Sequence, residues 1–300
     1  MTKKDPRNMI GYGSKDQKIR WPNNARIAVQ IVLNYEEGAE NCVLNGDNNS
    51  EIFLSEIIGA QPIKGRHINM ESLYEYGSRA GFWRLHKLFQ EKKIPITVFG
   101  VGMALEKNPE VCNAIIEANY EVASHGWRWI DYQNIKKAEE KKHMKLAIQA
   151  HTKIFGERPN GWYTGRCSPN TRDLVMEDGG FLYDSDSYSD DLPYWETRSK
   201  KKQLIIPYTL DTNDMRFVTN QGFNTGDHFF SYLKDSFDVL YEEGKTNPKM
   251  MSVGLHCRLI GKPGRVQSLK KFLDYILKHE DVWICKRIDI AKHWIKNYSK

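Results

Sequence analysis

Short apolar runs rich in β-branched and aromatic residues alternate with longer amphipathic stretches along the chain. Runs of this length and composition predict buried strands. They lie at 27–33, 95–100, 120–126, 161–166, 180–186, 204–211, 251–256 and 282–286. Between them, apolar residues recur at helical steps, in the groups Leu73, Tyr76, Ala80 and Trp83; Phe230, Leu233, Phe237 and Leu240; and Leu269, Phe272 and Ile276.

This alternation of strands and helices predicts a parallel sheet, because crossover helices are what join parallel strands. The repetition over one chain favours closure into a distorted (β/α) barrel of about seven parallel strands, an α/β fold. An open doubly wound sheet is the rival, but no G-x-G-x-x-G follows the first strand. We expect one domain over 1–300, with an N-terminal extension at 1–25 and a long polar connection at 38–70. A connection of that length usually has a function or contacts another subunit.

Composition narrows the class of protein. The chain has 300 residues, 40% hydrophobic and 27% charged, which is ordinary for a soluble globular protein. The net charge of +6 is modest, and the Lys-rich stretches 136–145 and 198–202 lack flanking aromatic platforms, so we expect no nucleic-acid partner. Five cysteines without a C-x-x-C pair argue against a disulfide framework or a zinc cluster. No run approaches the roughly 18 apolar residues of a membrane span, and the N-terminus lacks the apolar run of a signal peptide, so we expect a cytoplasmic protein.

Chemically active side chains gather at the carboxyl ends of the predicted strands. These ends share one edge of a parallel sheet, where active sites of such folds lie. A carboxylate base, an imidazole acid and a cationic clamp suit the hydrolysis of an unreactive amide. Each residue alone has a structural reading, as a cap, an ion pair or a solvated loop residue, but together they favour an active site. The set is Asn34, Glu36, Glu37, His125, Arg166, Asp184, Asp186, Asp211, Asp214 and His256.

Two cysteines lie beside members of this set. Cys167 follows Arg166, and Cys257 follows His256. A Cys–His nucleophile pair is conceivable, but adjacent strand residues point to opposite faces. We therefore interpret both cysteines as packing residues.

The order of these segments resembles the NodB-type polysaccharide deacetylases. The family motif T-F-D-D is matched by Asn34-Tyr35-Glu36-Glu37, and the family's L-x-L-H by "VGLH" at 253–256. The metal-binding H-[ST]-x-x-H is matched by "SHGWRW", where His125 is followed by Trp129 at the second histidine position. The third motif aligns with "YTGRC" (163–167), which places Tyr163 at the family's arginine and leaves Arg166 offset, and the fourth aligns with "DTNDM" (211–215).

Longer strings resemble one branch of this superfamily, the metal-independent bacterial allantoinases. They include "LNYEEGAENCVLNGD", "SHGWRWIDYQ", "GWYTGRCSPNTR", "PYTLDTNDMRF" and "SVGLHCRLIGKPGR", and matching strings span residues 33–294. The resemblance implies a NodB-type distorted barrel, a homotetramer, and hydrolysis of the hydantoin ring of allantoin to allantoate in purine catabolism. It also implies catalysis without a divalent metal.

The resemblance gives each site residue an expected role. Glu36 is the base that activates water, and His256 is the acid that protonates the leaving ring nitrogen. His125 and Arg166 are candidates for stabilising the oxyanion, and Asp214 orients a histidine or arginine. Like charges raise the proton affinity of one of two neighbouring carboxylates, which would suit a base working near neutral pH. The expected substrate-binding residues are Asn34, Glu37, Trp129 and Asp211.

The expected cofactor is none. An open zinc site normally keeps three protein ligands, and Trp129 in place of the second histidine leaves only Glu37 and His125, enough for at most a weakly bound divalent ion. Three rival functions remain: a polysaccharide or peptidoglycan deacetylase, another cyclic amidase or imidase acting on hydantoin-like rings, and a non-catalytic binding protein. A deacetylase needs a metal triad, which is broken in this chain. A binding protein has no need of the pair Glu36 and His256, so the presence of that pair counts against it.

Overall fold

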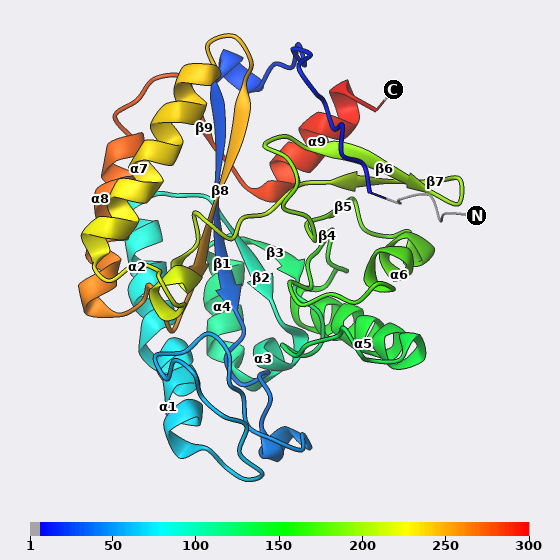
Figure 1. The fold of residues 1–300 in the computed structure, drawn as a ribbon, viewed down its shortest axis with the longest axis vertical. Helices are drawn as coiled ribbons and strands as arrows, with labels where there is room; N and C mark the ends of the chain where they lie inside the picture. The colour runs from blue at the N-terminus through cyan, green and yellow to red at the C-terminus, as the bar shows by residue number, and fades with distance from the viewer. Residues whose placement is uncertain (1–6, 300) are drawn as a thin grey trace.

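The computed structural model describes residues 7–299. Within that range a nine-stranded sheet curls around a central interior and runs in the order β6-β7-β5-β4-β3-β2-β1-β8, with β9 also pairing with β1 (Figure 1). All pairs are parallel except β6 with β7. The strands are β1 (Ile27–Tyr35), β2 (Ile96–Gly100), β3 (Glu121–Ser124), β4 (Gly161–Trp162), β5 (Tyr183–Asp184), β6 (Tyr194–Arg198), β7 (Lys201–Ile205), β8 (Lys249–His256) and β9 (Val282–Ile284).

Helices cover the outside of this curled sheet, as expected for a (β/α) barrel (Figure 1). In Figure 1, α2, α7 and α8 lie on one side of β1 and β8, and α5 and α6 lie on the other side of the molecule. The helices are α1 (Ile68–Tyr76), α2 (Phe82–Lys92), α3 (Gly102–Lys107), α4 (Pro109–Glu117), α5 (Lys137–Phe155), α6 (Thr171–Asp178), α7 (Gly226–Glu243), α8 (Pro263–Ile276) and α9 (Arg287–Asn297). None of the helices within 7–299 combines the length and hydropathy needed to cross a membrane.

The distortion of the barrel lies between β7 and β8. Irregular chain spans that side: the Gly254 N–H donates to the Thr212 carbonyl at 3.0 Å, and Asn213 forms an isolated parallel bridge with Gly254. Each of the eight apolar runs predicted as strands overlaps one, which confirms the predicted alternation. The remaining strand, β6, was not predicted, because its sequence "YWETR" is half-buried to exposed and mixes charged with aromatic residues.

Strand β1 pairs with three other strands, and all nine of its residues are buried. It pairs with β8 along one edge, and with β9 and then β2 along the other. The register sets Asn34 opposite His256. The residues after β1 and the end of β8 are therefore neighbours at one end of the barrel.

A buried guanidinium ties the barrel interior together. Arg287, at the start of α9, is fully buried. It donates to Gln30 Oε1 at 2.6 Å on β1, to Ser252 Oγ at 3.0 Å on β8, and to Ser185 Oγ at 2.9 Å after β5. Because each contact satisfies a buried polar group, this arginine joins β1 and β8 to the end of β5, a strand that pairs with neither of them.

The helical face predicted around Leu73 and Trp83 was wrong by one residue. A π-helical turn, η3 (Gly77–Gly81), separates α1 from α2, and the buried positions on this stretch are Met70, Tyr74, Gly77, Gly81, Phe82 and Leu85. The buried face already passes through Tyr74 rather than Leu73 in α1, and the extra residue of the π turn rotates the helix that follows it, so a 3.6-residue period cannot predict the face of α2 from that of α1. The predicted face of α8, by contrast, is confirmed, since Leu269, Phe272 and Ile276 are all fully buried.

Candidate active site

The candidate site lies where β1, β3 and β8 end. Glu36 and Glu37 directly follow β1, His125 directly follows β3, and His256 is the last residue of β8. Parallel pairing brings these ends together, as the sequence predicted. The four residues are at most 4% exposed.

Glu36 is the hub of the site. One carboxylate oxygen, Oε1, lies 3.3 Å from His125 Nε2 and 3.5 Å from His256 Nε2. The other, Oε2, accepts a hydrogen bond from Arg258 Nη1 at 2.7 Å. Burial alone would raise the pKa of Glu36, but Arg258, His256 and the hydrogen bond from His125 overcome it and hold the pKa well below its usual range. The resting carboxylate is therefore ionised at neutral pH.

His256 is paired with a second carboxylate. Its Nδ1 lies 2.6 Å from Asp214 Oδ1, and Asp214 Oδ2 accepts the backbone N–H groups of His256 at 2.7 Å and of Ile260 at 3.0 Å. Burial lowers the pKa of His256, but Glu36 and Asp214 outweigh burial and raise it to about 9. The imidazole is consequently protonated at neutral pH, which is the form a general acid needs.

Glu37 differs from its neighbour. Its Oε2 accepts the Glu36 backbone N–H at 3.0 Å, while Oε1 lies 3.7 Å from Arg258 Nη1. Burial raises the pKa of Glu37 to about 7; Arg258 opposes this and Glu36 adds to it. The carboxyl with raised proton affinity is thus Glu37. The base expected to be tuned in this way, Glu36, is instead held ionised.

Arg258 is the site residue that the sequence analysis missed. It lies two residues beyond the strand, is fully buried, and donates from Nε to the Leu54 carbonyl at 3.0 Å. Its guanidinium carbon lies 4.3 Å from the Tyr74 ring centroid and 5.0 Å from that of Trp129. In "LHCRL" strand alternation would place Arg258 on the same side as His256, but a turn begins at 257, so alternation gives no signal for its direction.

The long connection covers the site through the segment 51–54. Glu51 pairs with Arg166 Nη1 at 3.4 Å, and Phe53 stacks on Trp129 with ring centroids 6.1 Å apart. The Arg166 guanidinium carbon lies 5.1 Å from the Trp129 ring centroid. Trp129 is 4% exposed, and the two cations, Arg166 and Arg258, both approach its ring. The described contacts of Arg166 thus place it in the aromatic wall rather than beside Glu36.

The remaining predicted residues do not all belong to the buried cluster around Glu36. Asn34 donates from Nδ2 to Tyr208 Oη at 2.9 Å and to the Leu255 carbonyl at 3.0 Å, so it holds two elements together beneath the site. Asp211 is exposed and accepts hydrogen bonds from Thr209 and Tyr232, apart from the buried cluster. The packing role expected for Cys257 agrees with its complete burial; for Cys167 it was wrong, because that side chain is exposed.

Known proteins resemble this chain along nearly its whole length. A Schizosaccharomyces pombe protein named "Putative polysaccharide deacetylase" is 46% identical over 97% of this chain and 97% of its own. The polysaccharide deacetylase profile matches residues 69–177. The chain belongs to the polysaccharide deacetylase family. Two solved structures superpose with TM-scores of 0.97: a probable polysaccharide deacetylase from Pseudomonas aeruginosa PAO1, 59% identical over 99% of this chain and 100% of its own, and Puue allantoinase, 58% identical over 99% of each.

At the positions where deacetylases of this family bind a metal, the side chains of this chain do not fit a metal ion. The indole of Trp129 offers no donor atom for a metal. Glu37 Oε1 faces the Arg258 guanidinium, and His125 Nε2 faces Glu36. In the part of the chain that the structure describes, no three His, Cys, Asp or Glu side chains are arranged to hold an ion. A cation fixed beside both carboxylates opposes a second cation there.

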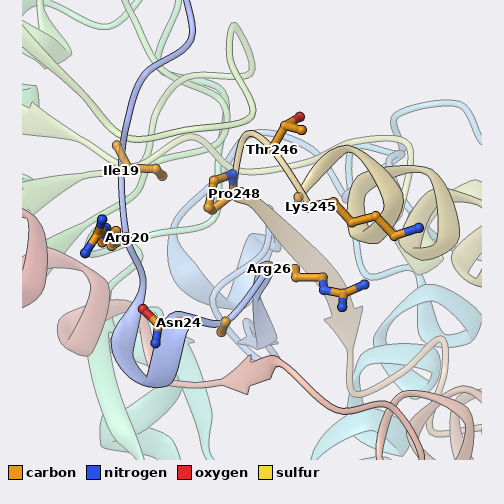
Figure 2. Close-up of a pocket in the computed structure, with 9 residues that line it drawn as sticks. Ile19, Arg20, Asn24, Arg26, Lys245, Thr246 and Pro248 are labelled. Carbon is orange, nitrogen blue, oxygen red and sulfur yellow. The ribbon is translucent and has the colours of Figure 1, made fainter.

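A pocket elsewhere on the barrel is not part of this site. It has a volume of ≈ 310 Å³ and lies beside the start of β1, at the opposite end of that strand from Glu36 (Figure 2). Arg20, Arg26 and Lys245 line it, but Figure 2 shows the side chains of Arg20 and Lys245 extending in opposite directions. Its cations do not converge on one point.

Proposed function

We propose that this polysaccharide deacetylase family member is an allantoinase, hydrolysing the hydantoin ring of allantoin to allantoate in purine catabolism without a metal. The observation that carries the proposal is the arrangement around Glu36, whose Oε1 lies within 3.5 Å of two imidazole Nε2 atoms while Oε2 is paired with a guanidinium. Such a site supplies a base, an acid and fixed positive charge from protein groups alone. The 58% identity to Puue allantoinase over 99% of both chains supports the same function.

The reaction needs two proton transfers, and the site has a group for each. Glu36 takes a proton from water as the water oxygen bonds to the ring carbonyl carbon, and the carbonyl π electrons move to oxygen. As the tetrahedral intermediate collapses, the C–N bond breaks and the ring nitrogen takes a proton from His256. The new carboxylic acid ionises, and protons released to solvent balance the reaction as allantoin plus water giving allantoate and H⁺. Asp214 fixes the imidazole so that Nε2 faces the reacting atoms.

Burial of the site favours a small substrate over a polymer. Glu36, His125 and His256 are 1%, 2% and 4% exposed, and segment 51–54 covers the residues around them. A polysaccharide chain extends past the residue on which an enzyme acts, and needs an open groove. A detached heterocycle can be enclosed, with Trp129 forming a flat wall beside it.

Deacetylation of an N-acetylated sugar is the second candidate, favoured by the names of the relatives from Schizosaccharomyces pombe and Pseudomonas aeruginosa. One experiment distinguishes the candidate functions. Purified protein, with and without chelator, is incubated with allantoin, other hydantoins and an acetylated chitooligosaccharide, and allantoate, carbamoyl acids and acetate are measured. We expect allantoate, unaffected by chelator. Acetate release, or activity lost on chelation together with stoichiometric zinc, would overturn the proposal.

We also propose a homotetramer, as the resemblance to allantoinases implies. Apolar side chains on the long connection support it: Leu44, Ile58 and Ile63 are 67%, 56% and 44% exposed in a single chain. Burying such side chains against another subunit is favourable. Light scattering of the purified protein tests the proposal, and a monomeric mass would contradict it.

A further inference from the structure

Arg258 is held firmly on one side and unbonded on the other. Its Nε donates to the Leu54 carbonyl and its Nη1 donates to Glu36. Over residues 7–299, Nη2 is buried without a hydrogen-bond partner. Leaving a buried charged donor unsatisfied is unfavourable, and native structures rarely do so without a functional reason.

The fixed side of the guanidinium sets the direction of the free side. The group is planar, and the Tyr74 and Trp129 rings lie 4.3 and 5.0 Å from its central carbon. With Nε and Nη1 both bonded, Nη2 has one position left in that plane. One of its two N–H groups points to the Nη1 side of the guanidinium plane, the side on which Glu36 is bound.

We propose that Arg258 is a catalytic residue whose Nη2 binds the carbonyl oxygen of the amide that is cleaved and stabilises the oxyanion formed from it. This inference rests on the proposed function as a cyclic amidase. The water oxygen attacks the carbonyl carbon, Glu36 takes the proton, and the electron pair of the C=O bond moves to the oxygen held by Nη2. When the C–N bond breaks, that pair returns and His256 protonates the nitrogen.

The same guanidinium supplies the positive charge that a family metal would supply. It contacts both carboxylates after β1, at 2.7 Å from Glu36 and 3.7 Å from Glu37. Arg166, the cation expected for this role, is 20% exposed and pairs with Glu51 at 3.4 Å. A preorganised donor in a buried site stabilises an oxyanion far more than one in water.

The test compares Arg258→Met and Arg258→Lys with wild type, using Arg198→Met as a control at an exposed ion pair on β6. Initial rates are measured with allantoin and with unsubstituted hydantoin. Calorimetry measures hydantoin binding, and thermal melting reports folding. We expect roughly a hundredfold or greater loss of kcat in Arg258→Met. The Arg258→Lys variant should stay folded and recover only part of the rate. A lysine ammonium is a compact point charge and cannot bind Glu36 and the carbonyl oxygen through two nitrogens of one plane, as a guanidinium does. Arg198→Met should match wild type.

Two results would overturn the assignment. One is a folded Arg258→Met enzyme with kcat within threefold of wild type. The other, decisive should Arg258→Met fail to fold, is full wild-type kcat in Arg258→Lys. If wild type cleaves no cyclic amide, the proposed function fails separately, and the binding measurement still decides the role of Arg258. Equal hydantoin affinity in wild type and the folded variant, or no binding to either, then rejects it.

Discussion

His256 Nδ1 lies 2.6 Å from Asp214 Oδ1, and the same carboxylate also accepts the His256 backbone N–H through Oδ2. The ring and the main chain of one residue are thus held by one buried side chain. This double attachment fixes the imidazole so that Nε2 faces Glu36, and it sets the charge of the ring.

Asp214→Asn should narrow the pH range of activity. The acid form of His256 must be present, and in wild type it is lost as pH rises through the pKa of about 9. Removing the Asp214 charge lowers that pKa, so activity should decline at lower pH than in wild type. The measurement is kcat/KM against pH for both proteins. An unchanged alkaline limit would show that His256 is not the acid.

Glu36→Gln should abolish turnover while the protein stays folded. The amide keeps an oxygen for Arg258 but cannot take a proton from water, and general base catalysis contributes roughly 10²–10⁴-fold. Allantoate production and thermal melting are measured together, with Glu56→Gln, at a surface ion pair with Arg265, as the matched control. Normal turnover in the folded Glu36→Gln enzyme would remove Glu36 as the base.

Glu37→Gln should stabilise the protein in a pH-dependent way. A carboxyl whose folded pKa is raised to about 7 from 4.5 favours folding when protonated, and that advantage is lost as pH rises from about 4.5 to 7. The neutral amide avoids this loss, so the gain over wild type should grow to about 2–3 kcal/mol by pH 8. Chemical denaturation at pH 5 and pH 8 measures it. A difference that is equal at both values would contradict the prediction.

Gly77→Ala should displace the Glu37 carboxylate. A Cβ at Gly77 would lie 2.2 Å from Glu37 Oε1 and 2.7 Å from its Cδ, so the buried carboxylate must move. We expect a loss of ~1–3 kcal/mol in stability and a fall in kcat/KM. Gly264→Ala is the matched control, because nothing lies within 4 Å of its added Cβ. Equal behaviour of the two variants would show that Glu37 has room to shift.

Strand placement followed from the sequence because a strand buried between the outer helices and the barrel interior contains a continuous apolar run. The meeting of Glu36 with His256 also followed, since both lie at the ends of strands expected to be parallel. Two features had no such signal. Arg258 lies in a turn, where strand alternation no longer predicts direction. The acceptor of its Nε is the backbone carbonyl of Leu54, and every residue type carries the same carbonyl.

The exposed β6 and the shifted face of α1 and α2 have a related explanation. Both depend on local geometry that the spacing of apolar residues does not predict. For β6 it is an antiparallel hairpin at the sheet edge, and for the helices it is one π turn at Gly77–Gly81. The turn coincides with two glycines that pack against Glu37 and against the Cys257 carbonyl. Those contacts are tertiary, and spacing along the chain does not encode them.

Segment 51–54 covers the site and also provides the carbonyl that binds Arg258 Nε. With Glu36, Glu37, His125 and His256 at most 4% exposed as whole residues, the proposed reaction requires this segment to move aside for the substrate and to return. Displacement frees the guanidinium, and return fixes it again, so enclosure of the substrate and assembly of the charged site happen in the same motion. If ring cleavage is faster than that motion, the turnover rate will fall as solvent viscosity rises.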